Sequence, residues 1–346
     1  MARLPHDTPE GLFHFGEPAP VVERPPAATE TWLHPRGGAK PGETVLITGI
    51  AGGQGRLIAR RLANTFDLVG VDRTYWEGHP PGLRVHKVDI RKRKFEDIFR
   101  TERPSAVVHL AFIRHFRGDA ETRHEVNVLG TKRLLEYAIA HGVKRVVVLS
   151  SSYVYGALPD NPYYMDEDSP LNVSRNYPEV RDLAEVDTLA TGFLWRHPEI
   201  ATTIIRPVNT LGYYVHSAIG RYLRQRYVPS IMGFNPMMQF IHEEDVAEAF
   251  VRALERGARG VFNVVGPGAV PLSVAIRETG GTSVPLPETV ARRALDRLFR
   301  FGLFPVPADA VDFVKFPCTI DGRRFHEATE FRPLFTLEET LLSVRR

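Results

Sequence analysis

The sequence predicts an α/β protein built on a doubly wound parallel sheet, and three observations support this fold class. From residue 43 onward, short apolar runs alternate with amphipathic segments of helical length. A glycine-rich turn joins the first apolar run to the first helical segment. Of the 346 residues, 43% are hydrophobic and 25% are charged, so the chain can bury a core of ordinary size.

The expected strands and helices follow one another in turn. Seven apolar runs have the length of strands, at residues 44–48, 68–72, 84–87, 106–110, 145–149, 202–206 and 261–264. Four amphipathic segments are expected to be helices, near residues 55–65, 94–102, 120–141 and 182–196. Because consecutive parallel strands need a crossover between them, this series predicts a single doubly wound sheet.

The chain is predicted to divide into three parts. Residues 1–42 are rich in proline and lack periodicity, so we expect an N-terminal arm that is either loosely held or wraps over its own domain or a partner. Residues 43–210 form the sheet domain, and residues 237–265 return to it. Residues 211–236 and 266–346 then build a smaller C-terminal lobe.

Charge and composition exclude several classes of protein. The formal net charge is only +3 and no recognition motif accompanies it, so no nucleic acid partner is expected. No run approaches the roughly 20 apolar residues of a membrane span, and the first thirty residues lack the apolar core of a signal peptide. The single cysteine, Cys318, cannot form an internal disulfide. We therefore predict a cytoplasmic protein, with no metal site because the histidines are scattered.

Residues 289–300 form an amphipathic segment with a basic face, made of Arg292, Arg293, Arg297 and Arg300. A helix of this kind can lie on an anionic membrane. The alternative, which we favour, is a helix that packs on its own lobe and exposes its arginines to solvent. No membrane partner is expected on this interpretation.

The glycine-rich turn predicts a dinucleotide site. The strand at residues 45–48 runs directly into Thr-Gly-x-x-Gly-x-x-Gly, and a helix follows. Glycines let the backbone approach a pyrophosphate, and the helix start offers free N–H groups to its charge. The turn contains all five of the residues expected at this pyrophosphate, which are Gly49, Gly52, Gly53, Gln54 and Gly55.

A carboxylate after the second strand supports the same interpretation. Asp72 follows Gly52 by 20 residues, the spacing of an acid that binds a ribose hydroxyl in a Rossmann domain. Asp72 would repel a 2′-phosphate, which favours NAD over NADP. Arg73 keeps the alternative open, because an arginine there can accommodate that phosphate.

Further motifs follow the glycine turn in order. They lie at residues 88–90, 107–111, 127–131, 149–156, 206–209, 240–247 and 262–264. In this order the sequence, from residue 43 to its end, resembles the NAD-dependent epimerase/dehydratase family of the extended short-chain dehydrogenase/reductase superfamily. The likeness is that of a divergent member and resembles UDP-glucose 4-epimerase-like proteins. The resemblance implies a Rossmann domain that binds NAD, a substrate-binding C-terminal lobe and a homodimer. The helix expected at residues 126–140 either forms the dimer interface, as in many relatives, or buries its apolar positions in the core.

The resemblance also implies roles for individual residues. In the family, positions matching Asp89, Ile90, Leu110, Ala111, Asn127 and Pro207 lie along the cofactor. The matching catalytic positions are Ser151, which would hold the substrate oxygen, and Tyr177, the acid/base. Ser152 is the alternative to Ser151 and would otherwise contact substrate. Arg181 stands where the family carries a lysine that lowers the pKa of the tyrosine and holds the cofactor ribose.

The resemblance implies only some of the family's contacts to substrate. Family members that bind nucleotide diphosphosugars carry an arginine where this chain has Met238. Asn209 resembles the family's other diphosphate contact, and Arg221 could supply positive charge instead. His115 follows the loop beneath the cofactor, where it either binds an anionic substrate or lies on the surface.

These observations predict an NAD-dependent epimerase/dehydratase-type oxidoreductase. Its small-molecule substrate would be a sugar-like alcohol of the nucleotide-sugar type. Tyr177 would move the proton, Ser151 would bind the reacting oxygen, and Arg181 would adjust Tyr177. The alternative is an NAD-binding sensor or scaffold that has kept the fold and lost catalysis.

Overall fold

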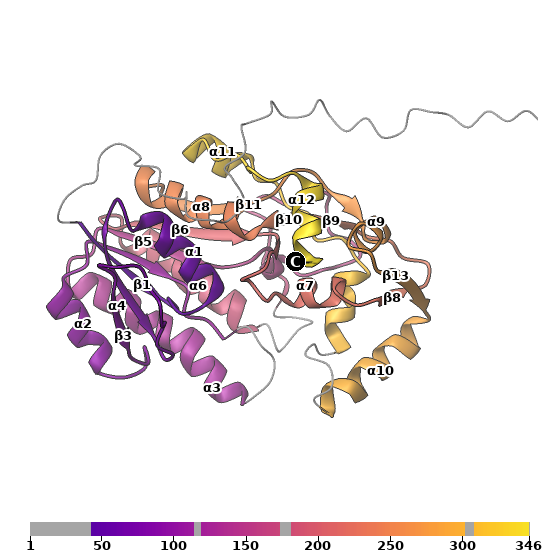
Figure 1. Cartoon of the computed structure of the whole chain (residues 1–346), viewed down its shortest axis with the longest axis horizontal. Coiled ribbons are helices and arrows are strands. Elements are labelled where there is room, and N and C mark those ends of the chain that lie inside the picture. Colours follow the sequence, from indigo (N-terminus) through magenta and orange to yellow (C-terminus); the bar gives the residue numbers. More distant parts are fainter. Residues whose placement is uncertain (1–42, 114–118, 174–180, 302–307, 346) are drawn as a thin grey trace, which may run out of the picture. The chain divides into compact units, whose positions relative to one another are not determined.

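The structure is a computed structural model that describes residues 43–113, 119–173, 181–301 and 308–345 (Figure 1). The predicted arm, residues 1–42, lies outside the described residues. So do two of the predicted site residues, His115 and Tyr177.

The fold is the predicted doubly wound sheet, with seven parallel strands in the order β3-β2-β1-β4-β5-β6-β11. All seven were expected from the sequence, and they are β1 (Thr44–Thr48), β2 (Asp67–Asp72), β3 (Arg84–Lys87), β4 (Ala106–His109), β5 (Arg145–Leu149), β6 (Ala201–Pro207) and β11 (Gly260–Val264). The order runs outward from β1 in one direction to β3 and then from β4 in the other direction. The winding therefore reverses between β1 and β4, where open α/β sheets bind their ligands.

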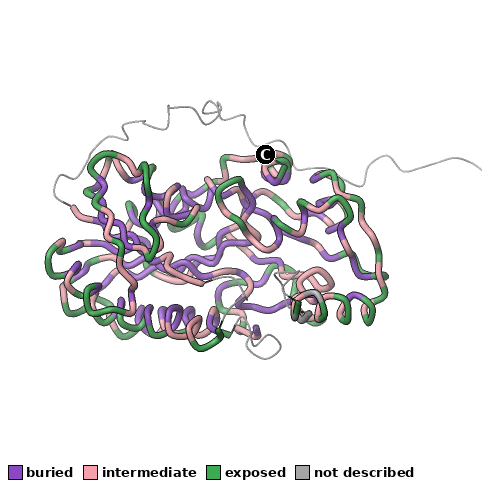
Figure 2. Tube along the Cα trace, turned by 60° about the horizontal axis from the view of Figure 1, so that its bottom comes forward, coloured by how far each residue is buried: buried purple, intermediate pink, exposed green. Residues whose placement is uncertain are grey.

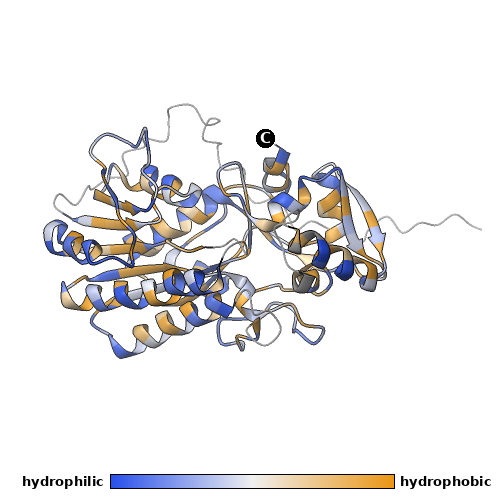
Figure 3. Ribbon diagram, turned by 90° about the horizontal axis from the view of Figure 1, so that it is seen from below, coloured by the Kyte–Doolittle hydropathy of each residue, from blue (hydrophilic) through white to orange (hydrophobic). Residues whose placement is uncertain are grey.

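Helices cover both faces of the sheet, and each face has its own hydrophobic core. One core contains residues of α1 (Gly53–Leu62) and α8 (Glu243–Arg256), and the other contains residues of α2 (Lys94–Glu102), α4 (Gly130–Ala140) and α6 (Arg181–Arg196). Along β1, Val45 and Ile47 enter the first core and Leu46 enters the second, as the period of two in a strand requires. Buried residues consequently gather in the interior of the trace in Figure 2, and apolar residues gather on the strands in Figure 3.

The helix expected at residues 120–141 is interrupted, which corrects the prediction of a single regular helix. It consists of α3 (Ala120–His124), a π-helical turn (Glu125–Leu129) and α4. A π turn carries one extra residue, and such turns occur frequently at functional sites. Within α4, Leu134, Leu135 and Ala138 are buried in the sheet core rather than exposed for a partner. The homodimer stays a prediction.

The chain after β6 forms several short elements. They are β7 (Asn209–Leu211), α7 (Ala218–Leu223), β8 (Tyr227–Ile231), β9 (Met237–Met238), β10 (Phe240–His242), β12 (Val270–Pro271), α9 (Leu272–Glu278), β13 (Thr282–Leu286), α10 (Glu288–Arg300), α11 (Arg323–Thr329) and α12 (Leu337–Leu342). Short 3₁₀ helices lie at Ser152–Tyr155, Ala308–Val314 and Ser343–Arg345. A separate hydrophobic cluster, with Leu223, Phe240 and Ile276 at its centre, holds this smaller region together. Between β10 and β12 the chain returns to the main sheet, where α8 packs against α1 and β5 and β11 pairs with β6, whereas β10 pairs with β7.

The basic amphipathic helix is α10. Its Ala291 is buried and its Leu295 partly buried, and both belong to a cluster with Ile231 and Val311. Arg292 pairs with Glu288 at 2.9 Å on the same helix. The apolar side of α10 therefore has a partner within the chain. Across the described ranges, no helix combines the length and the apolar character that crossing a bilayer requires.

Candidate functional site

A cavity of about 470 Å³ opens at the point where the winding of the sheet reverses. The glycine turn after β1 forms one wall, which we call the glycine wall. The turn of α3, the π turn and the start of α6 form the opposite wall, which we call the helix wall. The ends of β5 and β6 lie between these walls, and residues 214–219 complete the enclosure.

The glycine wall contains all five residues predicted there, Gly49, Gly52, Gly53, Gln54 and Gly55. Close packing requires glycine at position 55, and the backbone conformation requires it at position 49. A Cβ on Gly55 would lie 2.4 Å from the carbonyl oxygen of Gly49, and Gly49 itself has φ +73°. Gly52 caps α1 without a side-chain hydrogen bond, so no side chain occupies the helix start. The N–H groups there fit a pyrophosphate, because an uncapped helix N-terminus binds anions.

The predicted ribose acid lies beside this turn but outside the cavity. The Asp72 carboxylate accepts hydrogen bonds from the backbone N–H groups of Ala51, at 3.1 Å, and Thr74, at 3.0 Å. These contacts join the end of β2 to the glycine turn. Arg73, the residue that kept NADP open, is exposed. The adenosine half of a dinucleotide would thus lie on this side, away from the cavity.

Asp89 and Ile90 lie further along the same side, and neither lines the cavity. Burial raises the pKa of Asp89, but hydrogen bonds from Arg91 outweigh burial and leave that pKa below its ordinary value. Arg91 also pairs with Glu125 at 2.7 Å, so Asp89 belongs to an ionic network. The Ile90 side chain is buried where a Cβ on Gly130 would touch it.

The loop after β4 forms the floor of the cavity. Thr48 Oγ1 accepts hydrogen bonds from the N–H groups of Leu110 and Ala111 at 3.2 and 3.3 Å. Asn127, in the π turn, accepts from Ile113 N at 2.8 Å and donates to Ile113 O at 3.2 Å. Leu110 and Asn127 line the cavity, whereas Ala111 does not. The π turn therefore holds the loop after β4 in place through Asn127.

The predicted catalytic residues are only partly brought together. Ser151 lines the cavity, and its Oγ accepts a hydrogen bond from Tyr153 N at 3.3 Å. Ser152 is buried and does not line the cavity, so the structure offers Ser151 and not this alternative to a ligand. Arg181 is exposed at the first residue of α6 and does not line the cavity either.

The predicted substrate contacts differ in how accessible they are. Asn209 and Arg221 line the cavity, as does Pro207, which was expected along the cofactor. The two polar ends of the Asn209 side chain already have partners, since Oδ1 accepts from the Tyr153 hydroxyl at 2.6 Å and Nδ2 donates to Gln239 O at 2.9 Å. Met238, which replaces the family's arginine, is buried in the cluster of the smaller region. Arg221 is thus the predicted diphosphate contact that remains open.

The helix wall carries an ion pair that sequence reasoning missed. Arg123 of α3 and Asp182 of α6 both line the cavity, with Arg123 Nε 3.4 Å from Asp182 Oδ2. The two side chains are each 11% exposed. Spacing along the sequence could not have revealed this pair, because 59 residues separate its members and only the packing of α6 against the α3–α4 segment joins them.

Asp182 also belongs to the one cluster in the described ranges whose atoms could hold a metal ion, with His124 and Glu185. His124 Nδ1 lies 3.3 Å from Asp182 and 3.7 Å from Glu185. Arg123 occupies the other oxygen of Asp182, and a neighbouring guanidinium disfavours a cation there. The cluster therefore adds nothing to the chemistry of the cavity.

A second missed feature fastens the loop that closes the cavity. The buried Glu243 carboxylate accepts hydrogen bonds from the backbone N–H groups of Tyr213, Tyr214 and Val215 at 2.6 to 3.1 Å. Burial raises the pKa of Glu243 even though these donors oppose the shift. Gln54 donates to Glu243 O at 3.2 Å, which joins the same residue to the glycine wall.

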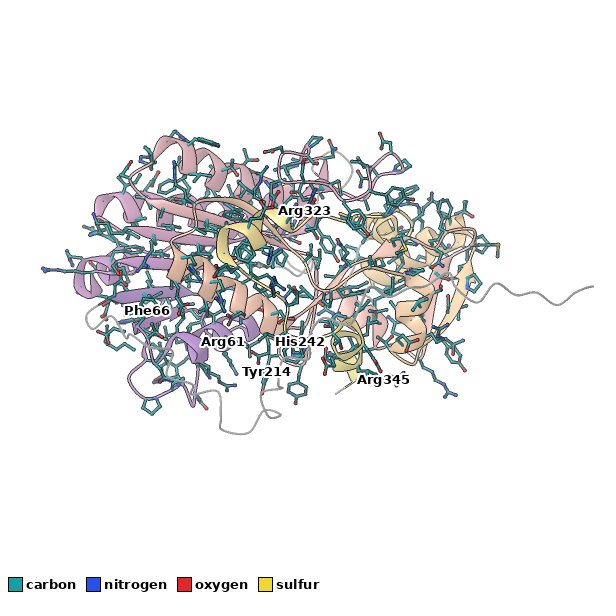
Figure 4. The ribbon with its side chains drawn as sticks, turned by 90° about the horizontal axis from the view of Figure 1, so that it is seen from above. Arg61, Phe66, Tyr214, His242, Arg323 and Arg345 are labelled. Carbon is teal, nitrogen blue, oxygen red and sulfur yellow. The ribbon has the colours of Figure 1, made fainter. Side chains whose placement is uncertain are left out.

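The fastened loop also explains Gly53. A Cβ there would lie 2.1 Å from Tyr214 O, so only glycine permits the loop to approach this closely. The Tyr214 ring (Figure 4) lies 5.8 Å from the guanidinium carbon of Arg60 on α1. The loop therefore contacts the glycine turn through its backbone and α1 through its side chain.

A buried polar network supports the strand ends beneath the cavity. Arg206 donates to both oxygens of Asp187 at 2.6 and 2.8 Å, and Asp187 also accepts from Ser150 Oγ at 2.5 Å. Arg206 further donates to the Tyr155 hydroxyl at 2.7 Å, while burial raises the pKa of Tyr155 to about 12. Ser150 lines the cavity, but its hydroxyl is committed to Asp187. Among Ser150, Ser151 and Ser152, Ser151 is consequently the one that is available to a ligand.

Comparisons with known proteins agree with this geometry. Residues 45–265 match the family described as "NAD dependent epimerase/dehydratase family". An uncharacterized protein of Mycobacterium tuberculosis is 30% identical over 259 residues, which cover 73% of this chain and 68% of that protein. UDP-glucose 4-epimerase of Mus musculus is 28% identical over 310 residues, covering 73% of this chain and 87% of the mouse protein.

Solved structures share the fold. MoeE5 in complex with UDP-glucose and NAD superposes with a TM-score of 0.67 at 25% identity, covering 87% of this chain and 97% of MoeE5. UDP-glucose 4-epimerase from Thermotoga maritima with UDP-glucose gives a TM-score of 0.68 at 20% identity, with 87% of this chain and 97% of that chain covered.

Proposed function

The chain belongs to the NAD-dependent epimerase/dehydratase family, and from this premise we propose that it is an NAD-dependent oxidoreductase whose substrate is the sugar alcohol group of a nucleotide sugar. One observation carries the proposal. The same cavity that is walled by an uncapped glycine turn also presents the Ser151 hydroxyl at the end of β5. A dinucleotide seated at the turn and a substrate oxygen at Ser151 would therefore share one enclosure.

The proposed reaction removes a hydride and a proton from a secondary alcohol. When bound, NAD accepts the hydride from the alcohol carbon. Ser151 donates a hydrogen bond to the reacting oxygen, and Tyr177 takes its proton, so the alcohol becomes a ketone. An epimerase returns the hydride to the other face of the ketone and the proton to its oxygen. A dehydrogenase releases the ketone as product. The hydroxyl of Ser151 and the phenol of Tyr177 are the groups that the proposal requires from this chain.

The substrate class rests on relatives. The mouse protein is named as a UDP-glucose 4-epimerase, and MoeE5 was solved with UDP-glucose. Two family contacts to a diphosphate are altered here, because Met238 replaces an arginine and the Asn209 amide is engaged by Tyr153 and Gln239. We propose that Arg221 supplies the diphosphate contact instead.

A nucleotide-sugar panel tests the proposal. The protein is incubated with NAD and with UDP- and dTDP-linked hexoses, while NADH absorbance and sugar interconversion are followed. We expect turnover on at least one sugar, and we expect Tyr177→Phe to lower kcat by about 100-fold or more because the proton acceptor is lost. Tyr163→Phe, at a side chain that is 75% exposed, is the matched control. Full activity in Tyr177→Phe would show that the assignment is wrong.

A second function is favoured by one observation. Arg181, at the position of the family's lysine, is exposed and outside the cavity. A protein with the fold but without that lysine would serve as an NAD-binding sensor or scaffold. This alternative predicts NAD binding without hydride exchange on any sugar of the panel, and it predicts that Arg181→Lys creates activity. Loss of an existing activity in Arg181→Lys would instead assign Arg181 to a working site.

A further inference from the structure

The helix wall presents a charged group directly to the cavity. Arg123 and Asp182 are both cavity-lining and nearly buried, and they face each other across the contact between the α3–α4 segment and α6. Asn127 holds the same carboxylate, with Nδ2 3.5 Å from Asp182 Oδ2. Arg123 Nε is buried and, among the described residues, has no partner with hydrogen-bond geometry. The guanidinium is therefore anchored by charge while its hydrogen-bonding capacity is incompletely used.

The position of the cavity decides which half of a dinucleotide it receives. Asp72 and Asp89 lie on the adenosine side of the glycine turn, and neither lines the cavity. A dinucleotide whose pyrophosphate lies at the turn would thus extend its other half, the nicotinamide and its ribose, into the cavity. That half would reach the helix wall, where Leu110, Asn127 and Arg123 are exposed to the cavity.

We propose that Arg123, anchored by Asp182, is the cation that binds the nicotinamide-ribose half of NAD, in the place that sequence reasoning gave to Arg181. The inference rests on the proposed NAD binding and adds the residue that secures the reactive half. An arginine fork can donate two hydrogen bonds to neighbouring ligand oxygens such as ribose hydroxyls or a phosphate. Arg181 offers no comparable contact, because it is exposed and does not line the cavity.

Calorimetric titration with two nucleotides tests this assignment without any substrate. NAD reports on the whole cofactor site, and ADP reports on the adenosine half alone. In Arg123→Gln we expect NAD to bind about tenfold or more weakly, since a charged hydrogen-bond donor is lost. ADP affinity should change less than about twofold. The matched control, Arg196→Gln, removes the same charge from an exposed residue at the other end of α6, outside the cavity, and should leave both affinities unchanged.

Two outcomes would overturn the assignment. One is an Arg123→Gln variant that binds NAD as tightly as the wild type. The other is a variant that loses NAD and ADP affinity equally, because that loss would come from the fold of the domain. Arg123→Lys, which retains the charge, should recover part of the NAD affinity and excludes misfolding as the cause. A wild-type protein that binds neither nucleotide would contradict the proposed function itself, a result distinct from either of these.

Discussion

The two walls of the cavity achieve their shape by different physical means. The glycine wall is made of backbone, and steric contacts such as the one between Gly55 and the Gly49 carbonyl fix it. The helix wall is made of side chains, and charge holds Arg123 to Asp182 across two helices. The glycine wall should therefore be intolerant of added volume, whereas the helix wall should tolerate volume better than a change of charge. Each of the following predictions tests one side of this contrast or the link between the two walls.

The largest effect is expected from added volume at the glycine wall. In Gly55→Val, the new Cβ would start 2.4 Å from Gly49 O, so the turn must open and lose its fit to a pyrophosphate. We expect NAD affinity to fall by about a thousandfold or more, measured by calorimetry. Gly78→Ala is the control for NAD affinity, because Gly78 lies in a turn at φ +71°, where alanine strains the backbone, but an added Cβ there meets no atom within 4 Å. Unchanged NAD affinity in Gly55→Val would contradict the placement of the cofactor at this turn.

A smaller effect is expected at the loop that closes the glycine wall. In Glu243→Gln, one acceptor oxygen becomes an NH₂ group that faces backbone N–H groups of residues 213–215. We expect the free energy of unfolding to fall by about 3 kcal/mol, since buried donors are left unsatisfied. Amide hydrogen exchange at Tyr214 and Val215 should accelerate.

Glu255→Gln serves as the control for that loop, because Glu255 lies on the same helix, α8, and is exposed. It should change neither the unfolding free energy nor the exchange rates. Equal exchange in Glu243→Gln and wild type would mean that the carboxylate does not fasten the loop.

The smallest effect concerns the link between the walls, and it depends on pH. Buried His109 joins Thr48, at 2.7 Å from Nδ1, to Thr131, at 2.9 Å from Nε2. Thr131 in turn donates to Asn127 O in the π turn. Burial lowers the pKa of His109 to about 4, below the value of about 6.5 in an unfolded chain. The unfolded state therefore binds more protons between those two values, and stability decreases as the pH falls through this window.

Urea unfolding at pH 7 and pH 5 measures this contribution. From pH 7 to pH 5, the free energy of unfolding of the wild type should fall by about 2 kcal/mol more than that of His109→Gln. The variant has no imidazole at this position to protonate. His242, whose pKa burial also lowers to about 4, contributes equally in both proteins and cancels. The same pH dependence of stability in both proteins would show that protonation of His109 does not destabilise the fold.

The contrast between the walls also explains which parts of the molecule the sequence could predict. The sheet and the glycine turn depend on local sequence patterns, namely apolar runs that alternate with helical segments and the spacing of the glycines. Residues 44–72 contain both patterns, so the sequence predicts this part of the molecule. Other contacts join side chains or loops that lie far apart along the chain. They are the Arg123–Asp182 ion pair, the hydrogen bonds of Glu243 to the loop at residues 213–215 and the Tyr153–Asn209 hydrogen bond. The π turn at Asn127 was not predicted either, because the sequence analysis treated residues 120–141 as one continuous helix.

Native mass spectrometry with equal concentrations of NAD and NADP tests the central claim most directly. We expect one NAD per chain and little NADP, because the Asp72 carboxylate would repel a 2′-phosphate. Binding of NADP alone would show that Arg73, rather than Asp72, selects the cofactor. A chain that takes up neither nucleotide would contradict the claim that its glycine wall is a dinucleotide site.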